Sequence, residues 1–77
     1  MIKIVVVDGF SSGKFLAKKL KADGCVLLHI SSGDNIDDYY YAGFDFSIYE
    51  EAIINEELAY TVSLVKDFNP SFILAGA

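Results

Sequence analysis

Cysteine is almost absent from this chain, and its scarcity excludes two ways of stabilising a small protein. The 77 residues hold one cysteine, so no internal disulfide can form, and Cys25 is expected to be a reduced, cytoplasmic thiol. Cys25 and His29 alone are too few ligands for a structural zinc site, which needs about four. The fold is therefore expected to depend on packing alone.

Arginine is absent, and eleven acidic residues outnumber six lysines, which gives a net charge of −5. Binding to nucleic acid needs a basic face, so no nucleic-acid partner is expected. The apolar run near the start, IVVV, is too short to span a membrane and has no cleavage site after it. We therefore expect a cytoplasmic protein with no membrane partner.

Apolar residues make up 53% of the sequence, which predicts a packed globule rather than a disordered chain. Residues 1–77 have room for a single domain. A chain of this length buries only about 60% of its unfolded surface, so we expect a stability on the order of a few kcal/mol.

The first part of the chain predicts a strand, a helix and a second strand. Residues 2–7 form a β-branched run that is typical of a buried parallel strand. Ser11 or Ser12 can cap the helix, and Gly24 can end it in a left-handed conformation. Residues 25–30 form the second strand. Because such crossovers are right-handed, the two strands should be parallel neighbours.

The second part repeats this pattern. A short strand is expected at residues 51–54, and Asn55 is a candidate N-cap for the next helix. Pro70 cannot continue that helix, so it should end near Asn69. The last apolar run, residues 71–77, predicts a fourth strand.

Helical spacing predicts which side chains of the two helices face the sheet. The predicted inward residues are Phe15, Leu16 and Leu20 on the first helix, and Leu58, Val62, Val65 and Phe68 on the second. Residues 31–38 are polar and turn-rich, and residues 39–49 hold six of the eleven aromatics. Half of these aromatics should pack on the second strand, and the alternative is a partner surface.

This alternation predicts an α/β fold, a small Rossmann-like three-layer sandwich with about four parallel strands in the order 3-2-1-4 and helices on both faces. The fourth strand would then be an apolar edge strand without protection. Two explanations remain open: the chain is a piece of a longer protein, or it forms a homodimer through this edge.

The loop DGFSSG after the first strand has three interpretations. A P-loop is one, but Gly9 and Gly13 stand one residue too close, and Phe15 replaces the magnesium-binding hydroxyl. A dinucleotide fingerprint is another, but the middle glycine is missing and Ser31 stands where an acid should be. The third is a tight turn. Asp8 then ties down the loop or contacts a substrate carboxylate or phosphate at the strand end.

Other candidate site residues are weaker. His29 lies in an apolar strand and is expected to be a core or edge histidine with a hydrogen bond rather than a catalytic group. Asp34, Asp37 and Asp38 contain the oxygen ligands that a hard cation prefers, but a solvated turn explains them better.

The stretches IVVVDGFSSGKFLAKKL, VLLHISS and NPSFILAGA together resemble the N-terminal domain of ATP-grasp ligases, which is also the kind of domain that begins biotin carboxylase. The likeness is greatest to the carbamoyl-phosphate-synthase-like and L-amino-acid-ligase-like members. In that group a D-G-x-S-x-G loop follows strand one, an aspartate-tyrosine stretch such as DDYY follows strand two, and a Pro-x-x-Ile-Leu-Ala-Gly strand precedes a glutamate turn. The likeness covers essentially the whole chain, which stops at Ala77 before that turn.

The resemblance implies a preATP-grasp domain, the N-terminal part of a longer carboxylate–amine ligase. Such ligases use ATP and magnesium to form an acylphosphate, and the nucleotide binds between two later domains. By this likeness the substrate cleft is faced by Asp8, Gly9, Ser11, Ser12, Gly13 and Gly76. The chain alone would hold no catalytic residue, metal or cofactor. Its partners would be the remaining ATP-grasp domains and a small carboxylate or amino-acid substrate.

Two other classes of function fit the same residues. The chain can be a stand-alone α/β module that binds a nucleotide or another small molecule. It can also be an interaction domain that associates through the fourth strand or through the aromatic residues 39–49.

Overall fold

The computed structural model of the chain describes residues 1–9, 13–31 and 35–75. Strands and helices alternate along these residues as the sequence predicts, with two short helices added before the third strand. The elements are β1 (Lys3–Val7), α1 (Gly13–Ala22), β2 (Val26–Ser31), α2 (Ile36–Tyr41), the 3-10 helix η1 (Phe46–Ile48), β3 (Glu51–Ile54), α3 (Leu58–Phe68) and β4 (Phe72–Ala75).

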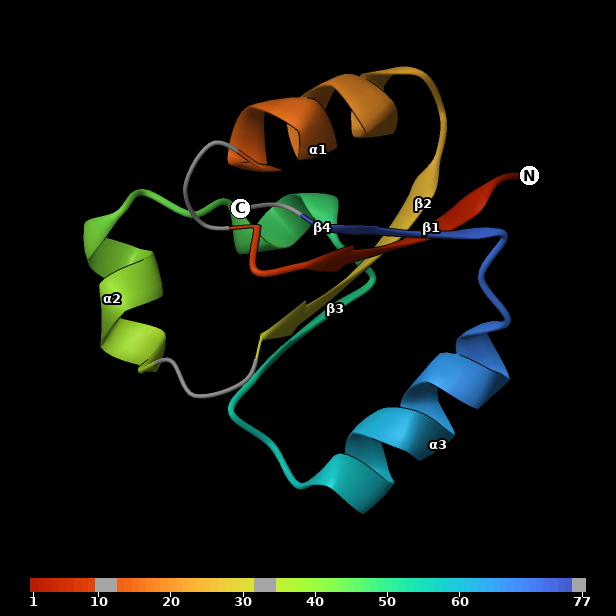
Figure 1. Ribbon diagram of the computed structural model, residues 1–77. Helices are drawn as coiled ribbons and strands as arrows, with labels where there is room; N and C mark the ends of the chain where they lie inside the picture. Colours follow the sequence, from red (N-terminus) through yellow and green to blue (C-terminus); the bar gives the residue numbers. More distant parts are fainter. Residues whose placement is uncertain (10–12, 32–34, 76–77) are drawn as a thin grey trace.

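The four strands form one parallel sheet in the order β3-β2-β1-β4, so the predicted fold class and strand order are confirmed. Figure 1 shows α1 on one side of this sheet and α3 on the other. All strands run the same way, so their carboxyl ends meet at one edge. The helix α2 lies on the side of the molecule toward which β1 and β2 run.

The central strands are buried on both faces because helices cover both. Ile4 and Val6 of β1 and Leu27 of β2 belong to the main apolar cluster on the α1 side of the sheet. Val5 and Leu28 alternate with these residues along their strands, so they point to the opposite side of the sheet, and they are also buried. This two-sided burial explains why both strands are nearly continuous apolar runs.

The end of α1 follows the prediction, but its inward face does not. Gly24 has a φ of +90°, and its N–H donates to the Lys21 carbonyl while the Cys25 N–H donates to the Leu20 carbonyl, which is a Schellman motif. Phe15 and Leu16, predicted to face the sheet, are exposed.

The residues of α1 that do face the sheet are small. Gly13 and Ala17 are its buried residues, and Leu20 packs against the core beside them. Glycine and alanine bring the helix close to the strands, which turns the larger residues at 15 and 16 outward.

Asn55 does not cap α3, contrary to the prediction. It adopts a left-handed φ of +59°, and its N–H donates to the Ser31 carbonyl, so it extends the pairing of β3 with β2. Glu57 is the N-cap instead. The predicted end of the helix is correct, since Asn69 is the C-cap in a left-handed conformation and Pro70 follows.

The inward face of α3 differs in part from the predicted one. Leu58 and Val62 are exposed, whereas Val65 and Phe68 are half-buried as predicted. Thr61 is also half-buried, so the side that faces the sheet is rotated away from the first predicted positions.

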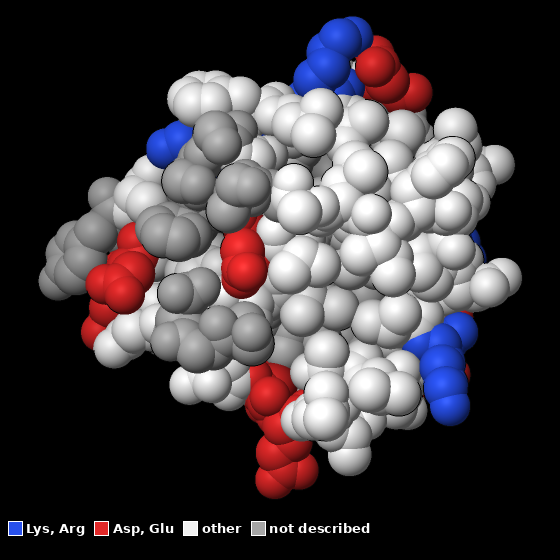
Figure 2. All heavy atoms as spheres, in the orientation of Figure 1, with Lys and Arg blue, Asp and Glu red and all other residues white. Residues whose placement is uncertain are grey.

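The strand β4 lies at an edge of the sheet, as predicted, with both of its faces largely exposed. Phe72 and Ile73 point to opposite faces and are 57% and 62% exposed. Figure 2 shows a broad area without charged side chains on the face of the molecule seen in Figure 1. No helix within the described ranges is long and apolar enough to cross a lipid bilayer.

Candidate functional site

Asp8 follows β1 directly and turns the chain away from the sheet. Its φ of +55° is left-handed, a conformation that aspartate tolerates better than most residues. Its N–H donates to the Ile30 carbonyl at 2.9 Å, which continues the pairing of β1 with β2. One carboxylate oxygen, Oδ1, is buried and has no hydrogen-bond partner among the described residues.

Gly9 brings this turn against the side chain of His29. The Gly9 N–H donates to His29 Nε2 at 2.9 Å within the buried interior. A Cβ atom at position 9 would lie 2.8 Å from Val6 Cγ1 and 3.3 Å from His29 Cδ2. The contact with Val6 is shorter than real Cβ atoms make, so any other residue at position 9 would force a shift of the backbone or of Val6.

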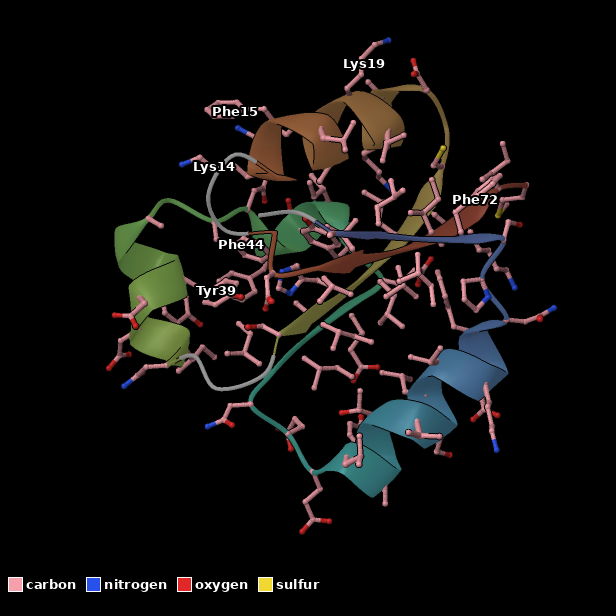
Figure 3. All side chains as sticks on the ribbon, in the orientation of Figure 1. Lys14, Phe15, Lys19, Tyr39, Phe44 and Phe72 are labelled. Carbon is pink, nitrogen blue, oxygen red and sulfur yellow. The ribbon has the colours of Figure 1, made fainter. Side chains whose placement is uncertain are left out.

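His29 sits in a cage of aromatic rings that we call the aromatic cage: Tyr39, Phe44 and Tyr49. The imidazole is fully buried, and the three ring centroids lie 5.3, 4.7 and 5.3 Å from its own, all in edge-to-face geometry. Figure 3 shows Tyr39 and Phe44 side by side between α2 and the sheet. Because Nε2 accepts the bond from Gly9, it carries no proton, and the imidazole is neutral in this arrangement.

The aromatic residues of segment 39–49 are partly in the core, as predicted. Tyr39, Phe44 and Tyr49 are buried, while Tyr40 is exposed. Two short helices, α2 and η1, shape this segment and were not predicted from the sequence. Asn35 caps α2 by accepting from the Asp37 N–H, and Asp45 caps η1 by accepting from the Ser47 N–H. In both caps the side chain accepts from the N–H two residues later. An asparagine or aspartate at such a position is the sequence signal that could have indicated these helices.

The remaining predicted site residues are only partly placed. Gly13 is the first residue of α1 and is buried, on the same side of the sheet as His29. Ser11, Ser12 and Gly76 lie outside the described residues. The Nζ of Lys14, the residue after Gly13, donates to the Ala42 carbonyl at 3.0 Å.

The position of the Asp8–Gly9 turn is the one where ligands bind in open α/β sheets. The strand order reverses between β1 and β4, and this turn stands at the carboxyl end of β1, beside that reversal. The first two amides of the turn are nevertheless committed to Ile30 and His29. They do not fit a nucleotide phosphate, so the P-loop interpretation fails for the part of the loop that is described.

Neither a metal centre nor an enclosed pocket is found in the described part of the chain. No group of three or more His, Cys, Asp or Glu side chains among these residues is placed to hold a metal ion. Asp37 and Asp38 are exposed in the first turn of α2, as expected for solvated residues, and Asp34 lies outside the described residues. The described surface also contains no pocket.

Tyr49 carries a buried hydroxyl that has no hydrogen-bond partner in the described part of the chain. Burial, helped by the nearby Tyr39 and Asp45, raises the pKa of Tyr49 from 10 to about 12. The folded state therefore holds the proton more tightly than the unfolded state does. The stability that this difference provides is complete below pH 10 and is lost as the pH rises toward 12.

Replacing Tyr49 by phenylalanine is expected to leave the free energy of unfolding unchanged or raise it by up to about 1 kcal/mol, because the hydroxyl loses no bond. The decline of stability between pH 10 and 12 should also become shallower. Urea denaturation across this pH range measures both effects. Tyr40→Phe, at an exposed position, is the matched control and should keep the wild-type slope. A loss of more than about 1 kcal/mol in Tyr49→Phe would contradict this account.

Comparisons with known proteins identify no relative. No protein-family model matches the chain, and neither the curated proteins nor the solved structures contain a match to it.

Proposed function

We propose that the chain is the non-catalytic N-terminal domain of an ATP-grasp carboxylate–amine ligase and forms one wall of its substrate cleft. The observation that supports this best is the Asp8–Gly9 turn, held by His29 at the carboxyl end of β1 in a sheet of order 3-2-1-4. A fixed turn at this edge is suited to present a side chain to a ligand.

In this proposal the cleft is faced by Asp8, Gly9, Ser11, Ser12, Gly13 and Gly76. The substrate is a small carboxylate or amino acid, and the setting is the cytoplasm. ATP and magnesium bind to the remaining domains, because the amides of Asp8 and Gly9 are already bonded within this one. This domain positions the substrate and packs on its neighbours.

Calorimetry with ATP–magnesium and with NAD tests the proposal against a stand-alone nucleotide-binding module. The chain alone is expected to give no binding heat with either nucleotide. Micromolar binding of either one would contradict the proposal and favour the module.

A fusion provides the positive test. The chain replaces the N-terminal domain of an L-amino-acid ligase, and ADP release is measured with and without amino acids. Release that depends on the amino acid is expected from the fusion and not from the ATP-binding domains alone. Equal release from both would contradict a role in forming the cleft.

A second candidate function is self-association through β4. The register with β1 places Phe72 opposite Ile4, and the β1 residues at even positions are bonded to β2. The backbone N–H and C=O of Ile73 therefore point to the open edge. The exposed, apolar side chains of β4 do not protect this edge in the way that charges would.

Replacing Ile73 by lysine is expected to weaken any self-association at least tenfold, because a charge on an edge strand opposes pairing. Sedimentation velocity over a range of concentrations measures the effect. Leu58→Lys, at an exposed position on α3, is the matched control and should associate as the wild type does. A wild-type chain that stays monomeric at high concentration would exclude this second candidate.

A further inference from the structure

The carboxylate of Asp8 can accept a hydrogen bond for which the described residues provide no donor. Its Oδ1 is buried and has no hydrogen-bond partner within residues 1–9, 13–31 and 35–75, although buried polar atoms in proteins are nearly always hydrogen-bonded. An unpaired buried oxygen of a charged group is costly, and a donor from a bound ligand is one explanation for such a group in a folded protein. The left-handed backbone of Asp8 is a further departure of the kind that gathers at ligand sites.

The surroundings of Asp8 favour a cation or a neutral donor over an anion. The N–H groups of Asp8 and Gly9 both donate to acceptors inside the protein, so neither is available to an anion. The lysine next along the chain, Lys14, donates to the Ala42 carbonyl. The one ion pair found among the described residues joins Lys19 to Asp23, on α1 and just after it.

We propose that Asp8 binds the protonated amino group of the substrate, with its Oδ1 as the acceptor. This inference rests on the proposed function for the identity of the ligand as a ligase substrate. It also sets aside the expectation that this turn contacts a substrate carboxylate or phosphate. The bond from Gly9 to His29 holds the turn, so Asp8 contacts the ligand and His29 is a positioning residue.

Three small probes show whether Asp8 binds an amino group or a carboxylate. L-Alanine has both groups, ethylamine lacks the carboxylate, and propionate lacks the amine. Each is titrated into the isotope-labelled chain while the amide NMR signals of Asp8 and Gly9 are followed. L-Alanine and ethylamine are expected to shift these signals in a saturable way, and propionate is not. The proposal would be overturned if only propionate gave saturable shifts. It would also be overturned if none of the three probes gave them.

Asp8→Asn keeps the shape of the side chain and removes its charge, and asparagine tolerates the left-handed backbone. This variant is expected to bind both amines at least tenfold more weakly. Asp37→Asn removes the same charge from an exposed position and should bind them as the wild type does. Equal loss in both variants would indicate general electrostatic attraction and overturn the proposal.

These results are independent of the test of the proposed function. ATP binding to the isolated chain would contradict the ligase assignment even if the amines bind at Asp8. Failure of the amines to bind would contradict the role of Asp8 even if the fusion releases ADP.

Discussion

Replacing His29 by alanine is expected to leave most of the protein unfolded at room temperature. Truncating a buried ring to alanine costs about 3–5 kcal/mol, because the cavity cannot close completely. The Gly9 N–H, which donates to His29 Nε2, would also lose its acceptor inside the protein, at about 1–3 kcal/mol. The sum exceeds the stability on the order of a few kcal/mol that a domain of this size is expected to have.

His29→Phe separates the two contributions. It keeps a ring within the aromatic cage and removes the acceptor, so it is expected to cost about 1–3 kcal/mol and to leave the protein folded. Circular dichroism during urea denaturation measures both variants. If His29→Ala unfolds at a urea concentration close to that of the wild type, the cage does not support the fold as we describe.

Replacing Gly9 by alanine is the second large effect that we expect, with a loss of about 1–3 kcal/mol. The new Cβ would meet Val6 Cγ1 at 2.8 Å. Val6 is buried in β1 and its branched side chain is short, so it cannot swing away from the contact. The chain would have to shift at position 9, which also strains the bond to His29.

A double-mutant cycle with Val6→Ala tests whether the collision is the cause. Val6→Ala removes the atom that Cβ would meet, so Gly9→Ala should cost clearly less in that background than in the wild type. Urea denaturation of the four proteins gives the coupling free energy. Strictly additive losses would mean that Gly9 is required for another reason.

The sheet was predictable because its signals are local and repeated. Residues 2–7 and 25–30 are apolar runs of strand length separated by one helix, and the handedness of such crossovers leaves few arrangements. The ends of the helices were predictable for the same reason. Gly24 was expected to adopt the left-handed position that it occupies, and Pro70 cannot continue the helix that ends at Asn69.

The residues through which each helix faces the sheet were less predictable, because they depend on how close the helix lies to the strands. The apolar spacing of α1 does not distinguish Phe15 from Ala17, and the close approach of the helix selects the smaller residue. Asn55 has the composition of an N-cap, but its pairing with Ser31 comes from a neighbouring strand. A local sequence pattern predicts neither the close approach of α1 to the sheet nor the pairing of Asn55 with Ser31.

The candidate site also has a part that was predictable from the sequence and a part that was not. Asp8 and Gly9 could be placed at the carboxyl end of a strand from the sequence alone. The bond between Gly9 and His29 joins residues 20 positions apart and depends on the parallel register that pairs Val6 with His29. The aromatic cage around His29 depends in turn on α2 and η1, two short helices that were not predicted from the sequence.

The bond from Gly9 to a buried imidazole gives a loop residue the solvent protection of a core strand. The amide hydrogen of Gly9 is buried and bonded, so it exchanges with water only when the turn separates from the imidazole. Deuterium uptake at this one position therefore reports how firmly the Asp8–Gly9 turn is held against a residue 20 positions away in the sequence.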